Sequence, residues 1–237
     1  MNKMVDGTKK YFKRNAGILI GLALICIVIT VNSPQFLTQN NIMNVLRQIS
    51  SNMFLASSMT MVLIAGGIDL SVGSGIAMIG VMAGTFLNMN IPIPVVIIIC
   101  LIAGALIGSV NGTIISRTTL PPFIVTYSIQ SILKGGTYVF TGGTTVRIDN
   151  RVWTNLGTGY AFGVIPYPVI YLSVVFVIVW LVLNKTKLGR HIYAVGGNEK
   201  AARFSGINVI RTRMFVYIFS GVMAALAGMV LCARQYS

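Results

Sequence analysis

The sequence predicts an all-α membrane protein, a polytopic helical bundle with about seven transmembrane spans. Hydrophobic residues make up 55% of the 237 residues and only 9% are charged, whereas a soluble domain has about 25% charged residues. The apolar residues are gathered in long runs, and a run of about 20 apolar residues crosses a bilayer as a helix. The basic residues fall mainly in the short segments between these runs.

Seven apolar runs mark the expected spans within a single transmembrane domain, residues 1–237. They cover residues 16–31, 42–65, 72–87, 93–115, 123–140, 167–183 and 215–233. Some of them carry glycines four residues apart, such as Gly104, Gly108 and Gly112. Small residues at this spacing form a flat stripe on which another helix approaches closely, which favours a tight bundle.

The distribution of basic residues predicts the topology. The net charge is +14, and the two main basic segments, 1–15 and 185–213, are separated by six runs. Both segments are therefore expected on the cytoplasmic side, with the 141–166 loop outside. Because the cations lie in short connections, no soluble basic face exists for nucleic acid.

One stretch, residues 66–75, interrupts the alternation of apolar runs with a carboxylate. No Lys, Arg, Asp or Glu occurs between Arg47 and Asp69, or between Asp69 and Arg117. An ionisable group at membrane depth is expensive, and by default it faces the bundle interior or an aqueous cavity. Asp69 is thus predicted to lie inside the protein or along a water-filled passage.

Glycines and a serine surround this carboxylate. Gly66, Gly67 and Gly73 permit positive φ angles and close backbone approach, while Asp69 or Ser71 is expected to cap the helix that follows. We therefore predict a helix that ends, a short irregular turn, and a helix that starts again. Such a break is tolerated at membrane depth only where protein or water surrounds it.

The sequence predicts neither catalysis nor a metal site. His191 is the only histidine, and the three cysteines lie in apolar runs without paired spacing. There is no phosphate-binding loop or dinucleotide fingerprint, and only one of the four carboxylates lies near membrane depth, so an acid/base pair is hard to assemble. We expect no enzyme activity and no cofactor in this chain.

The basic 185–213 segment contains the clearest local helix signals. Asn198 is expected to cap a short helix, Glu199 suits its positive end, Arg203 lies in the last turn, and Gly206 fits a left-handed stop. This short helix is either a rigid surface for another protein or an interfacial helix held by anionic lipid. Physical reasoning from the sequence gives these two alternatives similar weight.

A second charged residue, Lys134, has two possible positions. If its span starts near Thr118, the ammonium lies at the far membrane interface; if the span starts at Phe123, the cation is deeper and faces a cavity. The interfacial position is the one we expect.

Several motifs in register resemble the permease subunits of ribose/xylose/galactose-type ABC importers. They comprise residues 66–74, 111–112, 122–126, 134–135, 141–143, 189–199, 201–203 and 205–208. The resemblance implies a permease that translocates a monosaccharide or a similar small polyol across the bacterial cytoplasmic (inner) membrane, with a cytoplasmic N-terminus. Family members usually continue with several more spans, so the chain is expected to be truncated at its C-terminal end, either as a fragment or as a truncated gene product.

The resemblance also implies partners and roles. The partners are cytoplasmic ATP-binding subunits, which use the ATP, an extracytoplasmic sugar-binding protein that meets the 141–166 loop, and a second permease, identical or related. The implied pathway residues are Gly66, Gly67, Asp69, Ser71, Gly73 and Asn111. The implied coupling residues are Gly196, Gly197, Asn198, Glu199, Ala201, Ala202, Arg203 and Gly206.

Two other functions compete with this one. An ion-coupled secondary transporter would need no ATPase, but the scarcity of ionisable groups within the spans argues against it. A membrane scaffold without transport activity is the third possibility, and the interrupted helix at Asp69 argues mildly against that.

Overall fold

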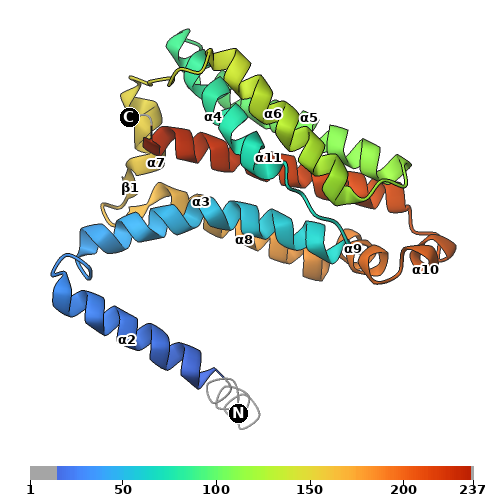
Figure 1. Ribbon diagram of the computed structural model, residues 1–237, viewed down its shortest axis with the longest axis horizontal. Helices are drawn as coiled ribbons and strands as arrows, with labels where there is room; N and C mark the ends of the chain where they lie inside the picture. Colours follow the sequence, from blue (N-terminus) through green and yellow to red (C-terminus); the bar gives the residue numbers. More distant parts are fainter. Residues whose placement is uncertain (1–14, 236–237) are drawn as a thin grey trace. The chain divides into compact units, whose positions relative to one another are not determined.

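The computed structural model describes residues 15–235, and these residues are almost entirely helical (Figure 1). The elements are α2 (Ala16–Asn32), α3 (Gln39–Ile64), α4 (Val72–Asn88), α5 (Ile93–Arg117), α6 (Pro122–Thr141), α7 (Arg151–Thr158), β1 (Tyr160–Ala161), β2 (Ile165–Pro166), α8 (Tyr167–Lys185), α9 (Lys187–Gly197), α10 (Glu199–Phe204) and α11 (Val209–Gln235). Except for the last residue of the 42–65 run, each predicted apolar run lies in a helix, which confirms a helical chain. The predicted basic segment 1–15 lies outside the described residues except for Asn15.

The predicted 141–166 loop has more structure than expected. It contains α7 and a small antiparallel hairpin in which Tyr160 pairs with Pro166. The strands are joined by a three-residue loop, 162–164, in which Phe162 and Gly163 have positive φ. The hairpin leaves the helical fold class unchanged, and it was not predicted because two-residue strands leave no periodic pattern in a sequence.

The last helix starts earlier than predicted. Helix α11 begins at Val209, inside the segment expected to be a loop. The side chain of Asn208 explains the early start, since its Oδ1 accepts a hydrogen bond of 2.9 Å from the backbone N–H of Arg211. A capped first turn lets the helix extend through polar residues before the apolar run.

Among residues 15–235, three helices are long and apolar enough to cross a membrane: α5, α8 and α11. Helices α2 and α4 are apolar but shorter. Helices α3 and α6 are long but more polar: asparagines and glutamines fill the first turns of α3, and α6 carries Lys134. The structure thus supports a membrane protein with several spans, while the count of seven stays a prediction.

The chain divides into two compact units, residues 1–46 and 47–237. The described part of the first unit holds α2, in which no residue is buried, and the start of α3. The second unit holds the rest of α3 and all later elements. Its central element is α11, which packs on α4, α5, α7 and α9 (Figure 1).

Glycines bring α5 and α11 into backbone contact. A Cβ atom on Gly108 would overlap the carbonyl oxygen of Tyr217, and one on Gly221 would overlap that of Gly104. The predicted glycine stripe on α5 is therefore confirmed as a close-approach surface, and α11 is its partner. Such contact lets van der Waals packing hold helices together where lipid removes the hydrophobic driving force.

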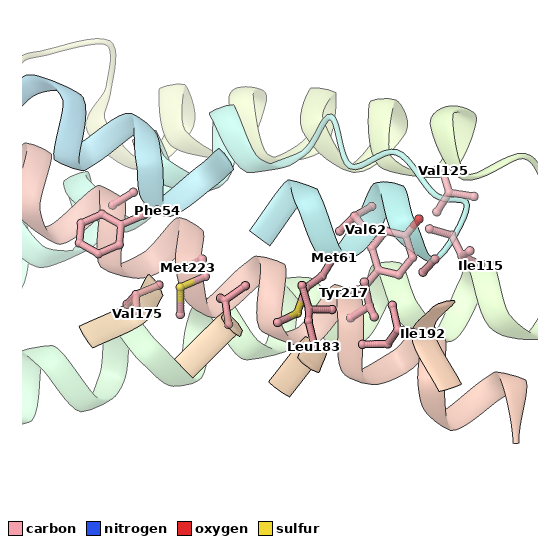
Figure 2. Close-up of a cluster of buried hydrophobic side chains, with 14 of the residues drawn as sticks. Phe54, Met61, Val62, Ile115, Val125, Val175, Leu183, Ile192, Tyr217 and Met223 are labelled. Carbon is pink, nitrogen blue, oxygen red and sulfur yellow. The ribbon is translucent and has the colours of Figure 1, made fainter. Parts of the chain in front are cut away.

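A cluster of buried apolar side chains fills the space between α3, α8, α9 and α11 (Figure 2). Phe54 and Met61 of α3, Leu183 of α8 and Ile192 of α9 lie in it beside Tyr217 of α11. This packing fixes α9 to the end of α3. It therefore positions the interrupted helix next to the segment predicted to couple to an ATPase.

Candidate functional site

The predicted interruption of the second span is present. Helix α3 ends at Ile64, and Gly66 has φ +77°. The N–H of Gly66 donates to the Leu63 carbonyl (3.0 Å) and the N–H of Gly67 to the Val62 carbonyl (2.9 Å), which is a Schellman stop that requires glycine. Helix α4 starts at Val72, so residues 65–71 form the predicted non-helical turn.

Asp69 is enclosed by protein and is 1% exposed. Its Oδ1 accepts hydrogen bonds from the backbone N–H of Ser71 (3.0 Å) and from the Ser71 hydroxyl (2.6 Å). Its Oδ2 accepts one of 2.8 Å from the hydroxyl of Ser220 on α11. Three donors satisfy the carboxylate, as a buried charged group requires.

Ser71 does not cap α4 in the way we expected. It stands at the N-cap position, but its side chain makes no capping hydrogen bond. The hydroxyl donates to Asp69 and accepts a 2.7 Å hydrogen bond from the side-chain amide of Asn111 on α5. The strong bond to the charged carboxylate fixes the orientation of the hydroxyl, and its oxygen then accepts from the Asn111 amide instead of a backbone N–H of α4.

This polar network joins the turn to three helices. Besides Asn111 of α5 and Ser220 of α11, Thr126 of α6 donates to the carbonyl of Ile68 (3.3 Å). The predicted set included Asn111 but neither of the two hydroxyls. The sequence does contain a signal for Ser220. Tyr217 and Ser220 are the only hydroxyl side chains between Phe215 and Ala233, and their spacing of three residues places them on one helical face, which predicts that this face meets a polar group.

The other predicted glycines differ in their surroundings. A Cβ atom on Gly67 would overlap the Tyr217 hydroxyl, so this glycine permits the close approach of α11. Gly73 has open space at its Cβ position. The cavity beside Asp69 measures about 10 Å³, whereas ligand pockets hold about 300–1,000 Å³. In this conformation the Asp69 cavity holds no more than one water molecule.

The local helix signals of the basic segment are confirmed. The side chain of Asn198 accepts a 3.0 Å hydrogen bond from the N–H of Ala201 and so caps α10. Gly206 has φ +80°, and the N–H of Ile207 reaches back to the Ala202 carbonyl (3.1 Å). Helix α10 is therefore capped at both ends by the residues that flank it.

Glu199 ties α10 to α11. Its carboxylate pairs with Arg203 one turn along (3.3 Å) and with Arg213 on α11 (2.7 Å). The first pair is largely exposed, and such pairs contribute little; the second links two helices and is more enclosed. The short helix is thus held as a rigid body against the start of α11.

The predicted coupling residues do not all face outward. Ala202 is buried against Val195 and Val209, and Glu199 is half-buried. The exposed residues are Gly196, Gly197, Asn198, Ala201, Arg203 and Gly206. Phe204 is 92% exposed. The surface formed by α10 and its flanking residues therefore has one large apolar side chain among small and polar neighbours.

The two predicted regions touch each other through the backbone. Gly196, near the end of α9, lies against Ile64 and Ala65 at the end of α3, and a Cβ atom on Gly196 would overlap the Ile64 carbonyl oxygen. The Cβ position of Gly66 is in turn 3.8 Å from the Cα of Gly196. The segment that carries α10 therefore rests directly on the turn that carries Asp69.

Replacing Asn198 by alanine tests the rigidity of α10. The variant loses the N-cap hydrogen bond, which costs about 1 kcal/mol, so we expect faster hydrogen exchange at residues 200–203 while α9 keeps its protection. Asn208→Ala is the matched control, because Asn208 caps α11 and not α10. Unchanged exchange at residues 200–203 in Asn198→Ala would mean that the cap does not hold this helix.

The chain matches known proteins over most of its length. The family described as "Branched-chain amino acid transport system / permease component" matches residues 41–237. The ribose import permease RbsC of Haemophilus influenzae is 40% identical over 222 residues, which are 92% of this chain and 68% of that protein. No solved structure matches the chain.

Two further relatives are named for other sugars. The galactose/methyl galactoside import permease MglC of Haemophilus influenzae is 33% identical over 241 residues, covering 94% of this chain and 71% of the relative. The D-allose transport system permease AlsC of Escherichia coli is 34% identical over 220 residues, covering 92% of this chain and 67% of the relative.

Proposed function

The chain belongs to the permease-component family described for the branched-chain amino acid transport system, and from this membership we propose that it is the membrane-spanning subunit of an ATP-binding cassette importer for a monosaccharide or a similar small polyol. Relatives named as ribose, galactose and allose permeases support the sugar class. As a transport permease component the chain is a membrane protein and not an enzyme.

The observation that carries the mechanism is the contact between Gly196 and the end of α3. Closure of an ATPase dimer against α10 would displace a rigid, doubly capped helix. Because α9 and the Ile64–Gly66 turn touch through backbone atoms, no flexible side chain lies between them to absorb the displacement, and the turn moves with α9. This turn is hydrogen-bonded to α5 through Ser71 and to α11 through Asp69.

The proposal assigns partners and an orientation. Two permeases, ATP-binding subunits that bind and hydrolyse the ATP, and an extracytoplasmic sugar-binding protein complete the importer, and no cofactor is assigned to this chain. The N-terminus and residues 185–213 face the cytoplasm, residues 141–166 face outward, and seven helices cross the bacterial cytoplasmic membrane. The basic residues of 185–213 support this orientation.

Phe204 is the proposed anchor for the ATP-binding subunit. Interfaces gain much of their energy from a few aromatic side chains that fill pockets on the partner, and this ring is 92% exposed. We expect Phe204→Ala to weaken ATPase binding by about tenfold, equivalent to about 1.4 kcal/mol. Phe162→Ala is the matched control, since Phe162 is 95% exposed on the hairpin and is proposed to face outward. Equal loss in both variants would contradict the assignment.

Reconstitution tests the function itself. The full permease, placed in liposomes with its ATP-binding subunits and sugar-binding protein, should accumulate labelled ribose, galactose or allose only when ATP is present on the side of the ATPase. Uptake driven by an ion gradient without the ATPase would overturn the proposal and favour a secondary transporter.

A further inference from the structure

A second cavity lies on a face of the bundle that the Asp69 network does not use. It is a groove of about 670 Å³ between α4, α6 and the segment that follows α6, a volume in the range of small-ligand sites. Its lining residues are Ser74, Ala77, Val81, Ser131, Lys134, Gly135, Thr137, Tyr138, Thr141, Gly143, Thr144, Thr145 and Val146. A groove lined by this many hydroxyl side chains is a poor binding surface for lipid acyl chains.

The exposed stripe of α6 that borders the groove is polar. Tyr127, Ser131, Lys134 and Tyr138 follow one another at spacings of four, three and four residues, which places them on one helical face. All four are exposed, and Tyr138 is 70% exposed. A polar face of this length in a spanning helix faces water or protein.

The bounds of helix α6 favour the deeper of the two positions that the sequence left open for Lys134. Helix α6 starts at Pro122 and ends at Thr141, so Lys134 precedes its last residue by about 10 Å along the axis. Both ion pairs recorded among residues 15–235 involve Glu199, and Lys134 takes part in neither. An ammonium in a groove without a carboxylate partner is available to a ligand.

Three hydroxyl groups of the groove can act as acceptors for a ligand. The hydroxyls of Ser131, Thr137 and Thr144 donate to backbone carbonyls of their own segment, at 3.1, 2.7 and 2.7 Å. Their lone pairs remain to accept hydrogen bonds, while Lys134 supplies donors. A ligand with many hydroxyl groups offers both donors and acceptors, whereas an inorganic anion would leave the acceptors unsatisfied.

We propose that the α4–α6 groove binds the transported sugar on its way through the membrane, with the Lys134 ammonium donating to sugar hydroxyls and the Tyr138 ring covering an apolar face. This inference rests on the proposed function and deepens it, since it assigns a ligand-contacting surface separate from the Asp69 turn. Residues 143–146 line the groove and follow the end of α6 from which a binding protein would deliver the sugar.

Two adjacent glycines give a matched test. Gly135 lines the groove, Gly136 does not, and a Cβ atom at either position has open space. In the assembled transporter, with the native cysteines replaced by alanine, Gly135→Cys and Gly136→Cys are labelled with a bulky, membrane-impermeant thiol reagent. D-ribose, D-galactose and D-allose are tested in turn, and the transported one should slow labelling of Gly135→Cys about threefold or more while leaving Gly136→Cys unchanged. Equal rates with and without every sugar overturn the proposal.

Uptake measurements separate this proposal from the proposed function. With ATP present, Gly135→Phe should lower sugar uptake about tenfold and Gly136→Phe less than about twofold, while Lys134→Met should raise the half-saturating sugar concentration about tenfold or more, the loss of one charged hydrogen bond. If the unaltered transporter moves none of the sugars on ATP, the proposed function fails. If it moves one and both phenylalanine variants behave alike, only the groove assignment fails.

Discussion

Replacing Gly196 by alanine is expected to reduce ATP-driven uptake by about 100-fold. The added methyl group overlaps the carbonyl oxygen of Ile64, and no rotamer change can move either a Cβ atom or a backbone oxygen. Overpacking of this kind costs about 1–3 kcal/mol, and 1.4 kcal/mol corresponds to a factor of about ten. To avoid the overlap, α9 must move away from the end of α3, and the path from α10 to the Asp69 turn is broken.

The measurement compares uptake with ATP hydrolysis in the reconstituted transporter. Gly196→Ala should retain most ATPase activity, because α10 keeps its own caps, but hydrolysis should no longer drive sugar entry. Gly197→Ala is the control, since it adds the same methyl group one residue later, where nothing lies within 4 Å. Coupled uptake at the normal rate in Gly196→Ala would show that the contact transmits nothing.

Local signals in the sequence predicted local structure well. The Asn198 cap, the Gly206 stop and the Gly66 stop each depend on a few consecutive residues, and side-chain capping or a positive φ angle leaves a clear residue preference. The same holds for the helical runs, whose apolar composition predicts where the helices lie, although α11 starts at Val209, before its apolar run. These features need no knowledge of what packs against them.

Contacts between distant segments were beyond prediction. The glycine stripe of α5 indicated that some helix approaches closely, but only the structure identifies α11 as that helix. A glycine pair at 196–197 looks the same at both positions in the sequence, yet one residue touches α3 and the other touches nothing. Packing partners follow from the arrangement of whole helices, which periodicity does not encode.

Competition between neighbouring groups accounts for the error at Ser71. A serine at an N-cap position usually accepts a hydrogen bond from the helix backbone. Here a carboxylate two residues earlier takes the hydroxyl proton, and Asn111 occupies the oxygen. The sequence contained Asp69, but the arrival of the Asn111 side chain from α5, which completes the network, is a tertiary event.

Replacing Asp69 by alanine is expected to be the most destabilising change in the turn. The variant leaves the Ser71 N–H, the Ser71 hydroxyl and the Ser220 hydroxyl without their acceptor, and each unsatisfied buried group costs about 1–3 kcal/mol. We expect a loss of about 4 kcal/mol in the free energy of unfolding, measured by thermal or denaturant unfolding in detergent. Asp149→Ala, an exposed carboxylate in the 141–166 loop, should change stability by less than about 0.5 kcal/mol.

The graded variants show what the negative charge itself contributes. Asp69→Asn keeps one acceptor oxygen for Ser71, and the Ser220 hydroxyl can turn to accept from the new amide. This variant should therefore lose only about half as much free energy of unfolding as Asp69→Ala. Ser220→Ala removes a single donor and should cost about 1 kcal/mol. If stability and uptake fall together along this series, Asp69 acts by holding the turn. If Asp69→Asn loses far more uptake than its loss of stability explains, the charge itself contributes to transport, because the amide keeps the shape of the carboxylate and part of its hydrogen bonding.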